Sequence, residues 1–283
     1  MTLTVARAMG ERLRGAGIRY VFGHPGGEVV DLIEGFRQAG LEFVLTRHET
    51  AAAFMAEATA SSSGAPGACL ATLGPGATNL ITGVAHAYLD RAAVVVFTGQ
   101  LPADRYAIAT HQRLDLGALF APVTKWQARV TAINAVAVTE RGLRVAMRPR
   151  RGPVYLEVPS DVPRQEEPGG LPPPAPAATP LDGAIDPGSV QDAARLIAES
   201  RRPVILAGID ALDDRVVMPL RRLAEGWSCP VMVGPKAKGI LREDHPLFLG
   251  TIEGLGTAKL FEWIEASDLV LMIGFDPVEF DRD

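Results

Sequence analysis

Short apolar runs alternate with longer helix-prone segments along most of this chain. The clearest run is Ala93-Val94-Val95-Val96-Phe97, which contains no polar residue. A β-branched run of this kind is typical of a strand that is buried on both faces of a parallel sheet. Strands that alternate with helices of about 10–15 residues are joined by right-handed crossovers, and this pattern excludes all-helical and antiparallel folds. The chain is therefore predicted to be an α/β protein, with a doubly wound parallel sheet and flanking helices.

A stretch rich in proline, glycine and alanine separates two such alternations. It covers residues 165–187 and includes Pro172-Pro173-Pro174. This composition favours an extended, semi-rigid chain that forms no core, and the stretch is long for a loop inside one domain. We predict a first domain at residues 1–164, a linker at 165–187 and a second α/β domain at 188–283. The second domain is expected to be incomplete, because the chain stops a few residues after its last expected strand, 269–273.

Composition limits the classes of partner and of cellular setting. The net charge of −5 argues against nucleic acid as the main partner. No secretory signal opens the chain and no apolar run reaches about 18 residues, so neither export nor a membrane partner is expected. Cys69 and Cys229 are the only cysteines, and two isolated thiols predict neither a disulfide framework nor a metal site. A soluble, cytoplasmic protein without metal ligands of its own is the expectation.

Three of the expected strands end in residues that suit ligand binding. These ends are Pro25-Gly26-Gly27, Glu49 and Gly74-Pro75-Gly76. In an open parallel sheet, ligands bind in the crevice at the carboxyl ends of the strands. The glycines let the backbone approach a ligand closely, and a carboxylate at this edge can exchange a proton with a bound base. From its position alone, Glu49 would be a first-turn glutamate that the helix dipole favours.

The glycine-rich turns exclude two common classes of site. None of them has the G-x-G-x-x-G spacing of a dinucleotide site or the pattern of a P-loop. The turns are better suited to a flat, uncharged ring that presses against the backbone.

Three motifs taken together resemble one known family. The residues that carry the resemblance are Tyr20-Val21-Phe22-Gly23, Pro25-Gly26-Gly27, His48-Glu49 and Gly74-Pro75-Gly76-Ala77-Thr78-Asn79, in this order and at this spacing. The pattern resembles the pyrimidine-binding domain of thiamin-diphosphate enzymes of the acetolactate synthase family. Residues 110–125 and 273–280 resemble the catabolic, FAD-independent members of that family, and the segment after the linker resembles the start of its central domain.

The resemblance implies a cofactor and a reaction. Thiamin diphosphate would be the cofactor, and FAD is not expected. A 2-oxo acid such as pyruvate would be decarboxylated and its two-carbon unit joined to a second carbonyl compound, which gives acetolactate. Glu49 would hydrogen-bond N1′ of the aminopyrimidine and so promote loss of the proton from thiazolium C2.

The resemblance also implies that this chain needs a partner. In the family, a C-terminal domain binds the diphosphate and Mg²⁺ through a Gly-Asp-Gly motif, and this chain contains no such motif. The family glutamate acts on cofactor held by another subunit, so a homodimer, a homotetramer or a separate partner subunit is implied. The chain by itself is expected to be inactive.

Further residues are assigned to the site by the same resemblance. Those that would shape the pyrimidine pocket around Glu49 are Pro25, Gly26, Thr72, Gly74 and Asn79. His111 and Gln112 would lie near the reacting carbonyl, although His111 read without the family is an exposed loop histidine. Glu28 stands where catabolic acetolactate synthases usually carry lysine. A negative charge there disfavours an anionic substrate unless it is paired or turned away.

Three alternative functions remain open at this point. The chain could be the alpha subunit of a two-chain decarboxylase similar to sulfopyruvate decarboxylase. It could belong to a thiamin-diphosphate carboligase or lyase with another substrate, an alternative that Glu28 keeps open. It could also be a non-catalytic binding module that retains the fold.

Overall fold

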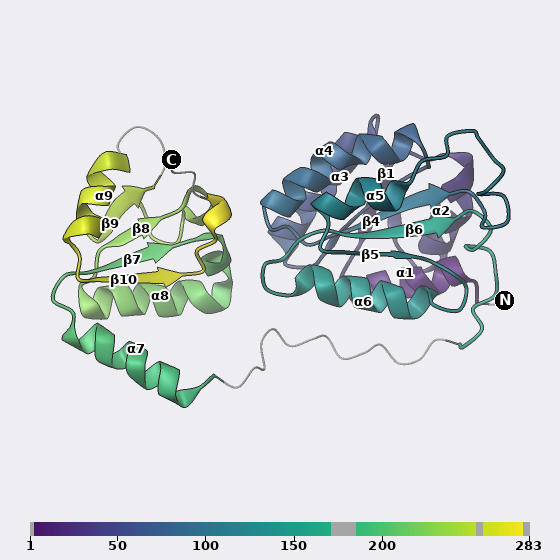
Figure 1. Ribbon diagram of the computed structural model, residues 1–283. Coiled ribbons are helices and arrows are strands. Elements are labelled where there is room, and N and C mark those ends of the chain that lie inside the picture. Colours follow the sequence, from purple (N-terminus) through teal and green to yellow (C-terminus); the bar gives the residue numbers. More distant parts are fainter. Residues whose placement is uncertain (1–2, 171–184, 253–256, 280–283) are drawn as a thin grey trace. The chain divides into compact units, whose positions relative to one another are not determined.

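The chain folds as two compact units, Met1–Pro180 and Leu181–Asp283. The computed structural model describes residues 3–170, 185–252 and 257–279 (Figure 1). Most of the proline-rich stretch, residues 171–184, therefore lies outside the described part. Residues 165–167 pair with the start of the first unit, since the backbone N–H of Val5 donates to Gln165 and that of Glu167 donates to Leu3. The exact domain and linker boundaries stay predictions.

The first unit is built on a six-stranded sheet in which every paired strand is parallel, and this confirms the predicted fold class. The strand order is β2-β1-β3-β4-β6-β5. The strands are β1 (Tyr20–Gly23), β2 (Glu42–Leu45), β3 (Gly67–Ala71), β4 (Val94–Gln100), β5 (Trp126–Arg129) and β6 (Val154–Pro159). The edge strand β5 was not among the predicted strands.

Helices cover both faces of this sheet. They are α1 (Val5–Gly15), α2 (Val30–Gln38), α3 (Glu49–Ser63), α4 (Pro75–Leu89), α5 (Leu116–Phe120) and α6 (Ala135–Met147). Figure 1 shows α1 and α6 on one side of the sheet and α3, α4 and α5 on the other. Side chains of the central strand β4 alternate between the two cores. Val95 and Phe97 join the core under α1, α2 and α6, whereas Val94 and Val96 join the core under α3 and α4.

The helices α3 and α4 pack closely because small residues line their contact. The buried residues of α3 include Ala52, Ala53, Ala56 and Ala60, and those of α4 include Gly76, Ala77, Gly83 and Ala87. A Cβ placed on Gly83 would lie 2.5 Å from the Cβ of Ala53, which is closer than real Cβ atoms approach. The backbones of the two helices therefore lie against one another with almost no side chain between them.

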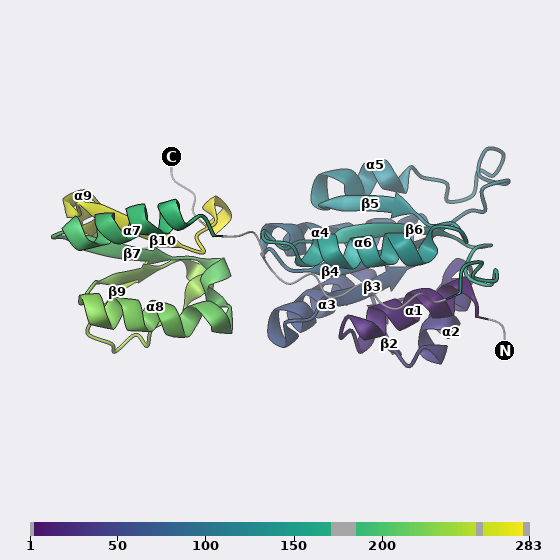
Figure 2. The same ribbon diagram turned by 90° about the horizontal axis from the view of Figure 1, so that it is seen from below.

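The second unit contains a parallel four-stranded sheet of order β10-β7-β8-β9. Its elements are α7 (Pro187–Glu199), β7 (Pro203–Ala207), α8 (Asp214–Trp227), β8 (Val231–Val233), β9 (Phe248–Thr251), α9 (Thr257–Ala266) and β10 (Leu269–Ile273). Figure 2 shows α8 and α9 on opposite sides of this sheet. The separate cores around Leu220 of α8 and Leu260 of α9 agree with that arrangement.

No helix in the described part of the chain combines the length and the apolar character that crossing a membrane requires.

Candidate functional site

The candidate residues of the first unit follow three strands that lie side by side. Gly23 of β1 is in register with Leu45 of β2 on one side and with Leu70 of β3 on the other. The chain runs from β1 to the edge strand β2 and then returns past β1 to β3. The sheet therefore changes direction of winding between β1 and β3, and such a switch point is where open α/β sheets bind ligands.

Glu49 is the first residue of α3 and its carboxylate contacts α4. Asn79 Nδ2 donates to Glu49 Oε2 at 3.0 Å, and only 8% of Glu49 is exposed. Thr50 Oγ1 donates to the backbone carbonyl of Asn79, while the backbone N–H of Thr50 donates to His48 Nδ1 at 3.2 Å. His48 thus caps α3, and Thr50 holds the start of α3 against α4. The glutamate is fixed in place by two helices.

Two glycines bring backbone close to this carboxylate and to Thr72. A Cβ on Gly76 would lie 3.3 Å from Glu49 Oε1 and 2.7 Å from Thr72 Cγ2. A Cβ on Gly26 would lie 2.6 Å from both Cβ and Oγ1 of Thr72. A side chain at either position would clash with Thr72. The two glycines therefore let the turns after β1 and β3 pack directly on Thr72, beside Glu49.

Glu28 is held against Thr72 by a short hydrogen bond. Thr72 Oγ1 donates to Glu28 Oε2 at 2.6 Å. On its other side, Glu28 borders a cavity of about 470 Å³ that Arg105 also lines. The negative charge of Glu28 is thus turned toward a hydroxyl donor, and an arginine stands at the same cavity.

The loop after β4 folds back onto the glycine turn before α4. Gly74 has φ +59°, and a Cβ there would lie 2.7 Å from the Cβ of Gln112. Gln112 itself has φ +52°, a conformation that non-glycine residues rarely adopt and that often marks a functional segment. The structure thus brings Gln112 to Gly74. His111 is exposed in the same loop, and Pro25 is exposed in the turn after β1.

Two residues near the site were not assigned to it from the sequence. Thr50 joins α3 to α4 as described above. Gln100, at the end of β4, is 1% exposed, and its Nε2 donates to Leu114 O at 3.3 Å and to Glu157 Oε2 at 3.2 Å. The signal for Gln100 was available, because an amide at the end of a strand that begins with a wholly apolar run must find buried partners.

A second carboxylate lies at the strand ends of the second unit. Glu279 Oε1 accepts hydrogen bonds from the backbone N–H groups of Ile209 at 2.7 Å and Asp276 at 3.3 Å. Its Oε2 is buried and has no hydrogen-bond partner among the described residues. A Cβ on Gly234 would lie 2.4 Å from that Oε2. Burial raises the pKa of Glu279 above its usual value, and Asp276 and Asp210 raise it further, against the lowering effect of the two backbone donors.

Both units match models of one enzyme family. Residues 3–119 match the thiamine pyrophosphate enzyme N-terminal TPP binding domain, and residues 190–282 match the thiamine pyrophosphate enzyme central domain. The chain belongs to the thiamine pyrophosphate enzymes. Thiamine pyrophosphate is another name for thiamin diphosphate, so these matches confirm the family and the cofactor class that the sequence motifs indicated.

Named relatives place the chain near acetolactate synthases. It is 37% identical over 275 residues to the probable acetolactate synthase large subunit of Methanocaldococcus jannaschii. The matched region covers 95% of this chain and 46% of that relative. It is 33% identical to the acetolactate synthase of Arthrospira platensis, over 99% of this chain and 50% of that protein. It is 32% identical to the large subunit of acetolactate synthase isozyme 1 of Escherichia coli K12, over 91% of this chain and 46% of that protein. The chain spans about half the length of these relatives.

Proposed function

We propose that this chain supplies the aminopyrimidine-binding side of the active site in an acetolactate-synthase-like enzyme. The contact between Glu49 and Asn79 carries the proposal, since it places a nearly buried carboxylate at the switch point of the sheet. The proposed reaction is decarboxylation of a 2-oxo acid such as pyruvate, followed by joining of its two-carbon unit to a second carbonyl compound.

The residues present fit the aminopyrimidine of thiamin diphosphate. Gly76 and Gly26 bring backbone without a side chain against Thr72 and beside Glu49 Oε1. A flat ring could press against this glycine backbone, as the proposed pocket requires. Pro25, Gly74 and Asn79 complete the proposed pocket. When bound, the cofactor supplies the carbon nucleophile and the electron sink for the reaction. Glu49 would hold a proton at the ring nitrogen N1′, and Asn79 would fix the orientation of its carboxylate.

The surroundings of Glu28 support a 2-oxo acid as substrate. The hydrogen bond from Thr72 reduces the repulsion that this carboxylate would exert on an anion, and Arg105 offers a positive charge at the same cavity. His111 and Gln112 lie in the loop that reaches the glycine turn, and we assign them to the surroundings of the reacting carbonyl. Because Glu28 is negatively charged, it also supports a second candidate function, that of a carboligase or lyase of this family that acts on another substrate.

The diphosphate and Mg²⁺ would be held outside this chain. No Gly-Asp-Gly motif occurs in the sequence. We therefore propose two possible sources of that anchor. It could come from another part of a longer protein, supplied by a second copy in a homodimer or homotetramer, or from a separate subunit. The chain without the anchor is proposed to be inactive. The catabolic, FAD-independent type and a cytoplasmic location stay predictions of the sequence.

Replacement of Glu49 by glutamine tests the proposal. Glu49→Gln keeps the shape and the hydrogen bond to Asn79 but cannot exchange a proton, and general acid–base groups contribute about 10²–10⁴-fold to rate. We expect hydrogen–deuterium exchange at C2 of the cofactor, followed by NMR in the assembled holoenzyme, to slow by about 10²-fold or more. The exposed Glu42→Gln in β2 is the matched control and should exchange at the normal rate. Normal exchange in Glu49→Gln would remove Glu49 from the mechanism.

A further inference from the structure

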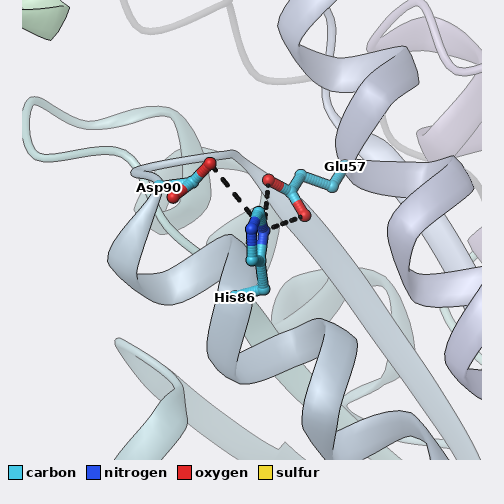
Figure 3. A group of neighbouring side chains, drawn as sticks. All are labelled: Glu57, His86 and Asp90. Carbon is cyan, nitrogen blue, oxygen red and sulfur yellow. Dashed lines mark hydrogen bonds and ion pairs between the residues drawn. The ribbon is translucent and has the colours of Figure 1, made fainter. Parts of the chain in front are cut away.

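A histidine and two carboxylates converge on the surface of α3 and α4, away from the strand ends. Figure 3 shows Glu57 reaching from α3 toward His86 and Asp90 of the α4 segment. His86 Nδ1 lies 2.9 Å from Oε1 and 2.8 Å from Oε2 of Glu57, and 3.8 Å from Oδ2 of Asp90. One ligand atom from each residue lies within 4.8 Å of the other two, and this is the one such group of three found among the described residues.

We propose that Glu57, His86 and Asp90 form a binding site for a divalent transition-metal ion, with Zn²⁺ as the expected occupant. The site is separate from the proposed cofactor pocket. No step of the proposed reaction uses these three side chains.

The distances between the ligand atoms are close to those of a coordinated ion. Ligands at about 2.0–2.2 Å from a tetrahedral ion lie roughly 3.3–3.6 Å from one another. The His86–Glu57 separation of 2.8 Å would have to open by about half an ångström, and the His86–Asp90 separation of 3.8 Å would have to close by less than that.

The helix backbones position the three residues as ligands of one ion. His86 and Asp90 are four residues apart, a spacing that places side chains on the same face of a helix. Glu57 faces them across the close contact of α3 with α4, where small residues hold the helix backbones together. The ligands are therefore positioned by two rigid elements rather than by a loop.

The charges of Glu57 and Asp90 favour the binding of a cation beside His86. Two carboxylates surround one histidine, and Asp90 occupies the C-cap position of α4. The C-terminal end of a helix carries partial negative charge, which favours a cation close to Asp90. A divalent ion between Glu57 and Asp90 would neutralise both carboxylates together.

The chemistry and exposure of the ligands select the kind of ion. An imidazole nitrogen disfavours Mg²⁺ and Ca²⁺, which prefer oxygen ligands, and suits Zn²⁺ and its neighbours in the transition series. The side chain of Glu57 is 9% exposed, that of Asp90 21% and that of His86 49%. An ion can thus reach the group from the His86 side, and water can fill its fourth coordination position.

Such an ion would clamp the helix pair that holds Glu49. Glu57 follows Glu49 by eight residues in α3, which is about 12 Å along a helix axis. In α4, His86 follows Asn79 by seven residues, which is about 10 Å along the helix axis. Bound metal would therefore stabilise the packing of α3 on α4 two turns from the Glu49–Asn79 contact.

Metal titration of the 283-residue chain tests the site. The protein is prepared without a histidine tag, stripped with EDTA and titrated with Co²⁺, whose visible absorption reports ligand geometry. We expect one saturable equivalent of Co²⁺ that Zn²⁺ displaces, and a rise in melting temperature with Zn²⁺ that EDTA reverses. Glu57→Gln, His86→Asn and Asp90→Asn should each weaken binding at least about tenfold.

A second histidine–glutamate pair provides the control. His245 Nε2 lies 3.5 Å from Glu225 Oε1 in the second unit, and His245→Asn should leave Co²⁺ binding unchanged. Circular dichroism checks that each variant folds, and the half-exposed His86→Asn decides the matter if Glu57→Gln does not fold. Absence of saturable binding in the stripped protein, or equal binding by wild type and His86→Asn, would show that His86 is simply ion-paired with its carboxylates.

Discussion

Gly76 is the position at which a single methyl group should do most harm to the proposed pocket. In Gly76→Ala the new Cβ would lie 2.7 Å from Thr72 Cγ2 and 3.3 Å from Glu49 Oε1. Gly76 is the second residue of α4, so alanine suits the local backbone there. We expect the complete protein to stay folded but to bind thiamin diphosphate at least about tenfold more weakly, which is about 1.4 kcal/mol.

A glycine without neighbours serves as the control for that variant. Gly226 lies in α8, and a Cβ there would meet nothing within 4 Å. Gly226→Ala should raise stability slightly and leave cofactor binding unchanged. Equal cofactor affinity of Gly76→Ala and wild type, measured by fluorescence titration, would show that the crevice beside Glu49 is not the pyrimidine pocket.

Glu279 should make the stability of the second unit depend on pH. Its pKa is raised in the folded state because burial disfavours the charged form. Above about pH 4.5, its usual value, the folded state therefore binds more protons than the unfolded state does. The free energy of unfolding should fall as pH rises through this window and level off once Glu279 is ionised in the folded state as well. Urea unfolding of the chain at a series of pH values between 4.5 and 8 measures the trend.

Substitution of Glu279 isolates this contribution. Glu279→Gln cannot ionise, and its amide oxygen can still accept from Ile209 and Asp276, so the fall in stability with pH should become smaller. Glu262→Gln, on the exposed side of α9, should keep the wild-type slope. If Glu279→Gln also keeps that slope, another group is responsible for it.

The sequence motifs identified the residues that lie at the strand ends, but they did not predict the hydrogen bonds that hold these residues in place. Gly26, Glu49, Thr72 and Asn79 were grouped through a family pattern, and the structure brings them into contact. The bond from Thr50 to Asn79 could not be predicted, because it depends on how closely α3 approaches α4. The turn of Glu28 toward Thr72 likewise depends on side-chain conformation.

At the scale of the helices, Gly83 should be essential to the packing of α3 on α4. In Gly83→Ala the added Cβ would lie 2.5 Å from the Cβ of Ala53 and 3.1 Å from Thr50 O. Overpacking of this kind costs about 1–3 kcal/mol, of which the helix propensity of alanine recovers about 1. We expect the free energy of unfolding, from urea titration of the chain, to fall by up to about 2 kcal/mol.

A compensating change at Ala53 separates packing from other causes. Ala53→Gly removes the atom that the new methyl group would strike, so Gly83→Ala combined with Ala53→Gly should be more stable than the sum of the single changes indicates. An additive result would mean that the two residues do not meet in the way the structure places them.

Strand prediction succeeded for the fully buried strand β4 and for the edge strand β10, and it failed for the edge strands β5 and β9. The strand β4 was found because its run of apolar, β-branched residues has no other explanation in a soluble domain. The strands β5 and β9 were missed because both are short and only partly buried. Gly250, at φ +145°, further obscures β9. Their pairing comes from the neighbouring strand rather than from their own composition.

For the whole molecule, the first unit should fold without the second. Both of its hydrophobic cores draw their buried residues from positions 5–162. A protein of residues 1–170 should therefore unfold cooperatively at the temperature of the matching transition in the 283-residue chain. Calorimetry should find the two midpoints within about 4 °C, a difference of roughly 1–2 kcal/mol for a domain of this size.

The opposite result would change the proposed domain division. If residues 1–170 fail to show a cooperative transition while the 283-residue chain does, the second unit contributes to the stability of the first. The boundaries at 164 and 188 would then have to be abandoned as limits of independent folding.

The contact of α3 with α4 also limits how this domain could be redesigned in the laboratory. Alanine and glycine have almost no side-chain freedom, so the alignment of Glu49 with Asn79 depends on backbone fit that no repacking can restore. A mutant library that diversifies these two helices would consist mainly of members that have lost the contact between Glu49 and Asn79. The loop at residues 101–110, most of which is exposed, could be varied instead while the contact between Glu49 and Asn79 is kept.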